Sequence, residues 1–149
     1  MKLHIDISGQ IQQKSLNSAL GCVREDGVER SVFIKSKIKK EILTKYKGQV
    51  TNIIEKIHCI LIFYCINDLL EGVDEIIVCK DIDFRRLKRL LPLLFEGKLD
   101  NKKIMQRESN SDKSLAHRVA IKTKRNKRHA MKYITKRMVE DVLFKFKKM

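Results

Sequence analysis

The segment Leu3-His4-Ile5-Asp6-Ile7-Ser8-Gly9, near the start of the chain, alternates apolar and polar residues and ends in a glycine. This two-residue period is typical of a β-strand that places His4, Asp6 and Ser8 on one face and the apolar side chains on the other. We therefore expect a first strand over Lys2–Gly9. A carboxylate in a strand costs free energy when it is buried, unless a partner compensates it. That partner is either a hydrogen-bond donor, which would make Asp6 structural, or a metal ion.

Two further strands are predicted directly after the first. Ser18–Glu25 and Val28–Ser36 have strand-like sequences, and Asp26-Gly27 between them is a strong signal for a hairpin turn. We therefore expect the chain to begin as an antiparallel meander of three strands.

The middle of the chain alternates helical and strand-like patterns. Lys37–Lys47 is a lysine-rich candidate for a short helix, and Val50–Leu70 repeats apolar residues at the spacing of a helix that packs on a sheet. Asp74–Asp83 contains the apolar run Ile76-Ile77-Val78-Cys79, which is typical of a central strand covered on both faces. A second helix is predicted over Phe84–Phe95.

The rest of the chain is predicted as a loop, a strand and a helix. Asn101–Leu115 is polar and aperiodic, Ala116–Lys122 alternates like a fifth strand, and Lys124–His129 is a basic loop. A final helix is expected over Ala130–Lys148. The predicted order is β-β-β-α-β-α-β-α, an α/β fold in which the fourth strand returns parallel to an earlier one by a right-handed crossover.

The size and composition of the chain indicate one domain. A length of 149 residues with 43% hydrophobic content is enough for a single core. We expect one domain over residues 1–149, with a polar loop near 101–115 and a basic segment over 117–149. Since the sequence has no apolar run of 18 residues and no secretory signal, we expect a soluble cytoplasmic protein without a membrane partner.

The four cysteines of the chain do not form a metal or redox motif. None of them belongs to a C-x-x-C pair, which argues against a zinc ribbon and against a redox pair. Each lies within an apolar run, so we expect all four to be small buried side chains.

The charge of the chain is uneven. The net charge is +15, and residues 101–149 contribute +12 of it, with 16 Lys and Arg against four acids. This concentration predicts a polyanionic partner, most simply nucleic acid, although a solvated basic surface is the alternative. An aromatic content of 6% without Trp argues against a platform that stacks bases. The candidate nucleic-acid contacts are Lys124, Arg125, Lys127, Arg128, Lys132, Arg85 and Arg86.

The order of elements and two of the carboxylates resemble the ribonuclease H superfamily, which includes ribonucleases H, retroviral integrases and Holliday-junction resolvases. The resemblance rests on Asp6 in Ile5-Asp6-Ile7-Ser8-Gly9 and on Asp81 at the end of the run Ile76–Lys80. It implies a ribonuclease H-like mixed five-stranded sheet with helices on both faces.

The resemblance also implies a set of site residues and a cofactor. Members of the family hold two metal ions with carboxylates from strand one, the first long helix, strand four and the last helix. The implied catalytic residues are Asp6, Glu55, Asp81, Asp141 and His129, and the implied metal ligands are Asp6, Glu55 and Asp81, with Glu140 and Asp83 as alternatives to Asp141 and Asp81.

The physical chemistry of such a site is consistent with phosphodiester cleavage. Two neighbouring carboxylates repel each other unless a cation lies between them, and oxygen ligands with open positions suit Mg²⁺ or Mn²⁺. Two such ions could activate a water and stabilise the leaving oxygen. Three hypotheses follow: a two-metal nuclease acting on RNA or DNA, a non-catalytic nucleic-acid-binding module on the same scaffold, and a structural protein with an acidic protein partner.

Overall fold

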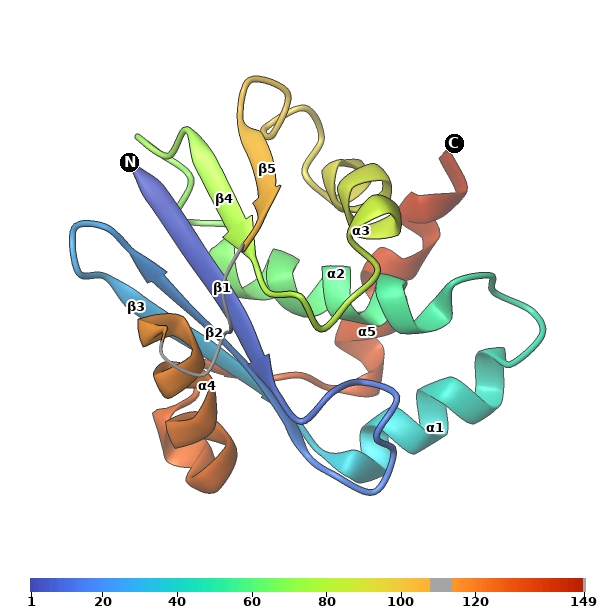
Figure 1. Ribbon diagram of the computed structural model, residues 1–149. Helices are drawn as coiled ribbons and strands as arrows, with labels where there is room; N and C mark the ends of the chain where they lie inside the picture. The colour runs from blue at the N-terminus through green and yellow to red at the C-terminus, as the bar shows by residue number, and fades with distance from the viewer. Residues whose placement is uncertain (108–113, 149) are drawn as a thin grey trace.

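The computed structural model describes residues 1–107 and 114–148. In these residues the chain forms an α/β fold with a six-stranded mixed sheet and five α-helices (Figure 1). The strands are β1 (Lys2–Ser8), β2 (Ser18–Arg24), β3 (Glu29–Ile34), β4 (Glu75–Val78), β5 (Lys103–Gln106) and β6 (Lys132–Tyr133). The α-helices are α1 (Ser36–Tyr46), α2 (Ile53–Ile66), α3 (Phe84–Leu90), α4 (Leu115–Arg125) and α5 (Lys136–Leu143), and the 3₁₀ segments are η1 (Leu91–Leu94), η3 (Lys127–His129) and η4 (Phe144–Lys148).

The strands lie in the order β5-β4-β1-β2-β3-β6. β1, β2 and β3 form the predicted antiparallel meander, whereas β4 is parallel to β1 and β5 is parallel to β4. The predicted hairpin turn at Asp26-Gly27 is confirmed, because Gly27 follows β2 with φ +95° and its amide donates to the carbonyl of Arg24. β4 and β5 therefore extend the sheet on the side of β1.

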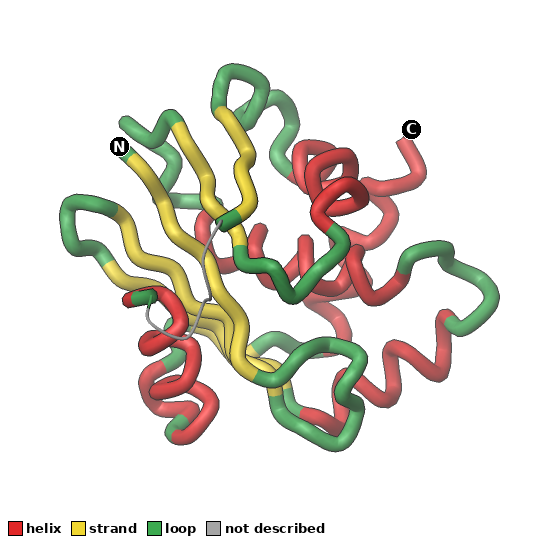
Figure 2. The backbone as a smooth tube through the Cα atoms, viewed as in Figure 1, coloured by secondary structure: helices red, strands yellow, loops and turns green. Residues whose placement is uncertain are grey.

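Helices cover both faces of the sheet, with α2 behind it and α4 in front of it in the view of Figures 1 and 2. Adjacent residues of β2 show the two faces. The Cys22 sulfur lies 3.5 Å from that of Cys65 on α2, whereas Gly21 packs against α4. The main core lies between the sheet and α2, where Leu3, Ile5 and Ile57 are fully buried.

Close packing places α4 on the sheet. A Cβ atom at Gly21 would lie 2.7 Å from the Ala120 nitrogen and 2.8 Å from the Ala116 oxygen, so only glycine admits the helix at this distance. Ala116, Ala120 and Thr123 are buried at helical spacing and form the face of α4 toward the sheet. The side chain of Ser114 caps the helix by accepting from the amide of His117.

The prediction of a fifth strand over Ala116–Lys122 was wrong, because this segment belongs to α4. The segment is too short for alternation and helical spacing to be separated by periodicity alone. The fifth strand is instead β5, which lies inside the loop predicted over Asn101–Leu115. β5 has four residues, half of them polar, and its pairing with β4 is a long-range contact that local pattern does not reveal. Residues 108–113 of the same predicted loop lie outside the described residues.

The predicted count of five strands was also wrong, because the sheet contains β6 in addition. β6 has two residues and pairs with the outer edge of β3. It lies within the helix predicted over Ala130–Lys148, which begins only at Lys136, where Thr135 caps α5. The predicted loop Lys124–His129 is in fact the end of α4 followed by η3.

Other boundaries are tighter than predicted. α2 is shorter than the predicted Val50–Leu70, and β4 ends at Val78, so that Asp81 lies in the loop after it. The predicted helix Phe84–Phe95 divides into α3 and η1 near Pro92. All four cysteines are free and buried, as expected. No helix within the described ranges is long and apolar enough to cross a membrane.

Candidate functional site

Asp6 lies near the end of β1 and faces α4. It is paired with Gly21 in the register between β1 and β2, so its side chain projects from the same face of the sheet on which α4 packs. The residue is completely buried, with 0% exposure. The side chains of β1 therefore alternate between the two faces of the sheet as predicted, and the Asp6 carboxylate lies in the interface between the sheet and α4.

The Asp6 carboxylate is surrounded by donors. Its Oδ1 accepts from the amide of Ile7 at 2.8 Å, and its Oδ2 accepts from the Ser114 hydroxyl at 3.3 Å. The Nδ1 atom of His117 lies 3.4 Å from Oδ2, and a guanidinium nitrogen of Arg107 lies 3.9 Å from it. Burial raises the pKa of Asp6, while the hydrogen bond from the Ile7 amide and the charges of His117 and Arg107 oppose that rise in part.

Asp6, Cys79 and Asp81 form the one cluster of potential metal ligands among the described residues. Their ligand atoms all lie within 4.8 Å of one another. The parallel register that pairs Lys2 with Glu75, continued along both strands, brings Asp6 opposite Cys79. Asp81 follows two residues later, at the edge of the sheet where β1 and β4 both end.

The Cys79 thiol stays protonated at neutral pH. Burial and, after it, the charge of Asp6 raise the pKa of Cys79 to about 12. The thiol hydrogen-bonds to the Asp6 carboxylate and contributes to holding it in place. Cys79 is thus a donor to Asp6, and the two carboxylates supply the negative charge of the cluster.

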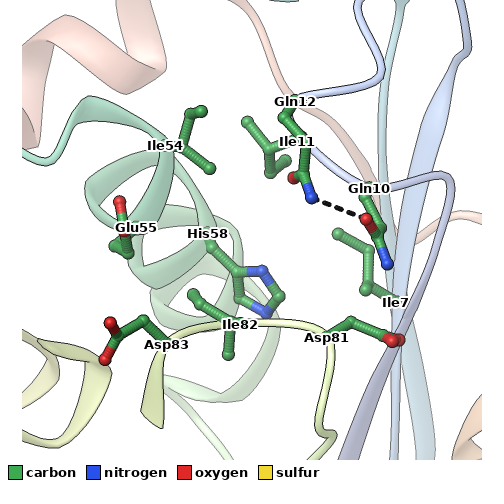
Figure 3. A pocket seen from close by; sticks show the side chains of 10 residues that line it. All are labelled: Ile7, Gln10, Ile11, Gln12, Ile54, Glu55, His58, Asp81, Ile82 and Asp83. Atoms are coloured by element: carbon green, nitrogen blue, oxygen red, sulfur yellow. Dashed lines mark hydrogen bonds between the residues drawn. The ribbon is translucent and has the colours of Figure 1, made fainter. Parts of the chain in front are cut away.

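A cavity of about 200 Å³ lies beside this cluster, between α2, the segment after β1 and the loop after β4 (Figure 3). Glu55, His58, Asp81 and Asp83 are the polar and charged residues from α2 and the β4–α3 loop that line it. Glu55 is held by Arg86, whose guanidinium lies 2.8 Å from its carboxylate. Asp83 caps α3 by accepting from the Arg86 amide.

His58 is a buried histidine on the wall of this cavity. Its ring lies between α2 and the loop that carries Asp81 (Figure 3), and its Nε2 atom has no hydrogen-bond partner among the described residues. Burial lowers the pKa of His58 to about 4, so the imidazole is neutral at pH 7. The pattern of the sequence marked this position only as part of an apolar helix.

The residues predicted for the last helix and its preceding loop lie elsewhere. Asp141 is exposed on α5, behind the sheet, where burial and, after it, the charge of Asp141 raise the pKa of Tyr64 on α2. Glu140 forms an ion pair with Lys45 of α1. His129 is exposed on η3, beyond the end of α4 that is remote from Asp6. The structure therefore brings Asp6 and Asp81 together and leaves these three residues apart from them.

The predicted nucleic-acid contacts divide between two regions. Lys124 and Arg125 end α4, with Lys127 and Arg128 following on η3, while Lys132 on β6 lies over the ring of Tyr64 at 5.6 Å. Arg85 and Arg86 lie on α3, and Arg86 is engaged by Glu55. Lys124 of α4 lies seven residues after His117 and on the same side of the helix. The two positions are therefore about 10 Å apart along the helix axis.

Ser114, His117 and Arg107 contact Asp6 and were not predicted from the sequence. The sequence predicts a strand at His117 and a loop at Arg107, so neither residue has a predicted relation to the first strand. One local signal was available, because a serine just before an apolar segment is a common helix N-cap. With the helix start set at Ser114, His117 would fall in the first turn of a helix.

Comparisons of the chain with protein-family models, with curated proteins and with solved structures return no match. The fold and the geometry of the site therefore carry the functional inference for this chain.

Proposed function

We propose that the protein is a metal-dependent nuclease of ribonuclease H-like fold, which cleaves phosphodiester bonds of RNA or DNA with Mg²⁺ or Mn²⁺ held by Asp6 and Asp81. Three features support the proposal: the order and direction of the strands, the approach of the two carboxylates, and the net charge of +15. Each of them has a separate physical basis.

The sheet supports the resemblance to the ribonuclease H superfamily. The resemblance implies three antiparallel strands first, a fourth strand parallel to the first, and helices on both faces. β1, β2 and β3 are antiparallel, β4 lies beside β1 and parallel to it, and β5 continues the sheet on that side. β6 is an addition at the opposite edge.

The observation that carries the proposal is the approach of Asp6 to Asp81. Carboxylate oxygens of the two residues lie within 4.8 Å of each other at the edge where the parallel strands β1 and β4 end. Ligands of open α/β sheets bind outside the carboxyl ends of the strands. Two carboxylates at this distance repel each other, and a cation between them removes the repulsion.

The donor atoms suit a hard divalent cation. Carboxylate oxygens are the ligands that Mg²⁺ and Mn²⁺ take in proteins, whereas Cys79 is a protonated thiol and not a thiolate ligand. Burial disfavours the charged form of Asp6, so a bound cation would stabilise it. Such an ion, when bound, lowers the pKa of a bound water and stabilises charge on a phosphate.

The residues of the chain then have distinct tasks. Asp6 and Asp81 hold the cation, while Ser114 and His117 fix the Oδ2 atom of Asp6 by contacts of 3.3 and 3.4 Å. The resemblance implies a side chain from the last helix, but the residues of α5 lie away from Asp6, and His117 of α4 takes this place in the proposal because α4 packs over Asp6. Glu55 would become a metal ligand only if its ion pair with Arg86 broke and its carboxylate bound the cation instead.

A cleavage assay with matched variants tests this function. Asp6→Asn and Asp81→Asn keep the size of each side chain and remove its charge, so we expect each to lower Mg²⁺- or Mn²⁺-dependent cleavage of nucleic acid at least about 100-fold. Asp141→Asn makes the same change at an exposed position on α5 and should cleave like the wild type. Equal activity of Asp6→Asn and the wild type would refute the proposal.

A non-catalytic nucleic-acid-binding module is the second candidate. The ion pair between Glu55 and Arg86 favours it, because it occupies the acid expected to complete the metal site. This candidate predicts salt-dependent binding of nucleic acid without cleavage in either metal. Binding by a wild-type protein that leaves the nucleic acid intact in both Mg²⁺ and Mn²⁺ would therefore select the module over the nuclease.

A further inference from the structure

Arg107 is an arginine beside the candidate metal site whose side chain is mostly buried. Its side chain is 9% exposed, and its Nη2 atom has no hydrogen-bond partner among the residues that the structure describes. A buried charged donor without a partner costs free energy. This cost points to a ligand that accepts from Nη2 when it binds.

The backbone fixes where Arg107 lies. It follows β5 directly, and its amide donates to the carbonyl of Val78 at 2.8 Å, which continues the ladder between β4 and β5. Arg107 is thereby held at the same edge of the sheet as Cys79 and Asp81. It also lines a hollow of about 720 Å³, together with His4 and Ser114, on the face of the sheet beyond the start of α4.

Within the part of the chain that the structure describes, the charge of Arg107 is only weakly compensated. Among the described residues, Asp6 is the one acid within ion-pair distance, and its Oδ2 is 3.9 Å from Nη1, which is longer than a hydrogen bond. Asp6 also accepts from Ser114 and lies beside His117. A cation bound by Asp6 would engage that carboxylate, and the guanidinium would lose its one acidic partner among the described residues.

We propose that Arg107 binds a phosphate oxygen of the nucleic-acid backbone and positions that phosphate against the cation held by Asp6 and Asp81. The planar guanidinium presents paired N–H donors, which match two oxygens of a phosphate. With a divalent cation, two carboxylates and Arg107, the site has a formal charge of +1, which suits one phosphodiester anion. The assignment of the phosphate to nucleic acid rests on the proposed function.

The alternative is that Arg107 only compensates Asp6 and stabilises the fold. The two roles differ in what the loss of the guanidinium changes. A structural partner of Asp6 affects stability and leaves phosphate affinity unaltered, whereas a phosphate ligand affects phosphate affinity directly. Cation affinity should be kept or increased in the second case, because a positive charge near the cation is removed.

The test measures binding of inorganic phosphate to the metal-loaded protein by calorimetry. In saturating Mg²⁺ we expect Arg107→Gln to weaken phosphate binding about 10- to 100-fold, the range of a hydrogen bond to a charged group, while Mg²⁺ binding is kept. Arg107→Lys retains the charge without the planar fork and should be intermediate. Arg118→Gln, an exposed change of the same charge on α4, should bind phosphate like the wild type.

The outcomes separate this proposal from the proposed function. Unchanged phosphate affinity in both folded Arg107 variants, or an equal loss in Arg118→Gln, would overturn the role of Arg107 whether or not the protein cleaves nucleic acid. Loss of phosphate affinity in Arg107→Gln alone supports the role, even if no cleavage is found. If Arg107→Gln does not fold, the comparison of Arg107→Lys with the wild type decides.

Discussion

At the scale of single residues, Asp6 is a fully buried carboxylate whose charge a bound cation would stabilise. Burial raises its pKa, which means that the folded protein disfavours the charged carboxylate that is present at neutral pH. Asp6 also lies beside a second carboxylate, Asp81, and two neighbouring carboxylates repel each other unless a cation lies between them.

The first prediction is that Asp6→Asn stabilises the protein in the absence of divalent cations. Asparagine keeps the carbonyl that accepts from Ile7 and removes the buried charge. Urea unfolding at pH 7 in a chelator should give a higher free energy of unfolding for the variant, and excess Mg²⁺ should stabilise the wild type alone. A less stable variant in the chelator would show that Asp6 is structural.

Lys39 is a second buried charge, and it makes the stability depend on pH. Its ammonium group donates to the carbonyls of Gln10 and Gln13 at 3.1 and 2.9 Å and to the Ser18 hydroxyl at 2.8 Å, so it fixes the segment between β1 and β2. Burial, with a smaller effect of the charge of Lys124, lowers the pKa of Lys39 to about 8 from 10.5.

The second prediction follows from that shift. Between about pH 8 and pH 10.5 the unfolded chain keeps the proton of Lys39 while the folded protein releases it. The free energy of unfolding therefore gains about 1 to 3 kcal/mol from this group as the pH rises through the window. Urea unfolding at several pH values should show this rise in the wild type and not in Lys39→Met. If the free energy of unfolding changed with pH in the same way in both proteins, the lowered pKa of Lys39 in the folded state would be contradicted.

At the scale of elements, the site depends on how closely α4 approaches β2. Ser114 and His117 reach Asp6 because the helix packs directly on the backbone of Gly21. Small side chains at Ala116 and Ala120 allow the same approach from the helix. The contact is specific to these positions and is not a general property of a helix on a sheet.

The third prediction is that Gly21→Ala perturbs both stability and the site. The added methyl group would meet the backbone of α4 at 2.7 and 2.8 Å, and overpacking of this kind costs about 1 to 3 kcal/mol. We expect thermal unfolding at a lower temperature and weaker Mn²⁺ binding, because the helix must move away from Asp6. Gly48→Ala, with φ +73° and no atom within 4 Å of the added methyl group, should cost stability without changing Mn²⁺ binding.

The elements also show how far the sequence predicts this structure. The first three strands follow from residue alternation and the Asp26-Gly27 turn, both of which are local signals. α4 and β5 were missed because their identity depends on distant partners: the bare backbone of Gly21 for the helix and the edge of β4 for the strand. As a result, Asp6 and Asp81 could be paired from the sequence, whereas His117 and Arg107 could not be assigned to the site.

At the scale of the whole molecule, positive charge is the dominant surface property. The net charge of +15 comes from 33 basic and 18 acidic residues. α4 contributes to this with no acidic residue among its eleven positions. Like charges on one helix repel each other slightly, so an anionic partner along α4 and η3 would reduce this repulsion.

The fourth prediction concerns the location of that partner. Neutralising Lys124, Arg125, Lys127 and Arg128 to Gln should weaken binding of a nucleic-acid duplex and reduce the slope of log affinity against log salt by about 2 to 4. The matched control changes four exposed lysines in and around α1, namely Lys35, Lys37, Lys40 and Lys47. An equal loss in both variants would indicate a non-specific effect of net charge instead of an interface at α4 and η3.

The central claim is that Asp6 and Asp81 together bind a divalent cation, and a calorimetric titration with Mn²⁺ tests it most directly. The titration compares the metal-free wild type with Asp81→Asn and Asp141→Asn. We expect saturable binding to the wild type and to Asp141→Asn, and an affinity at least about 100-fold weaker for Asp81→Asn. Binding of Mn²⁺ to Asp81→Asn with the affinity of the wild type would contradict it.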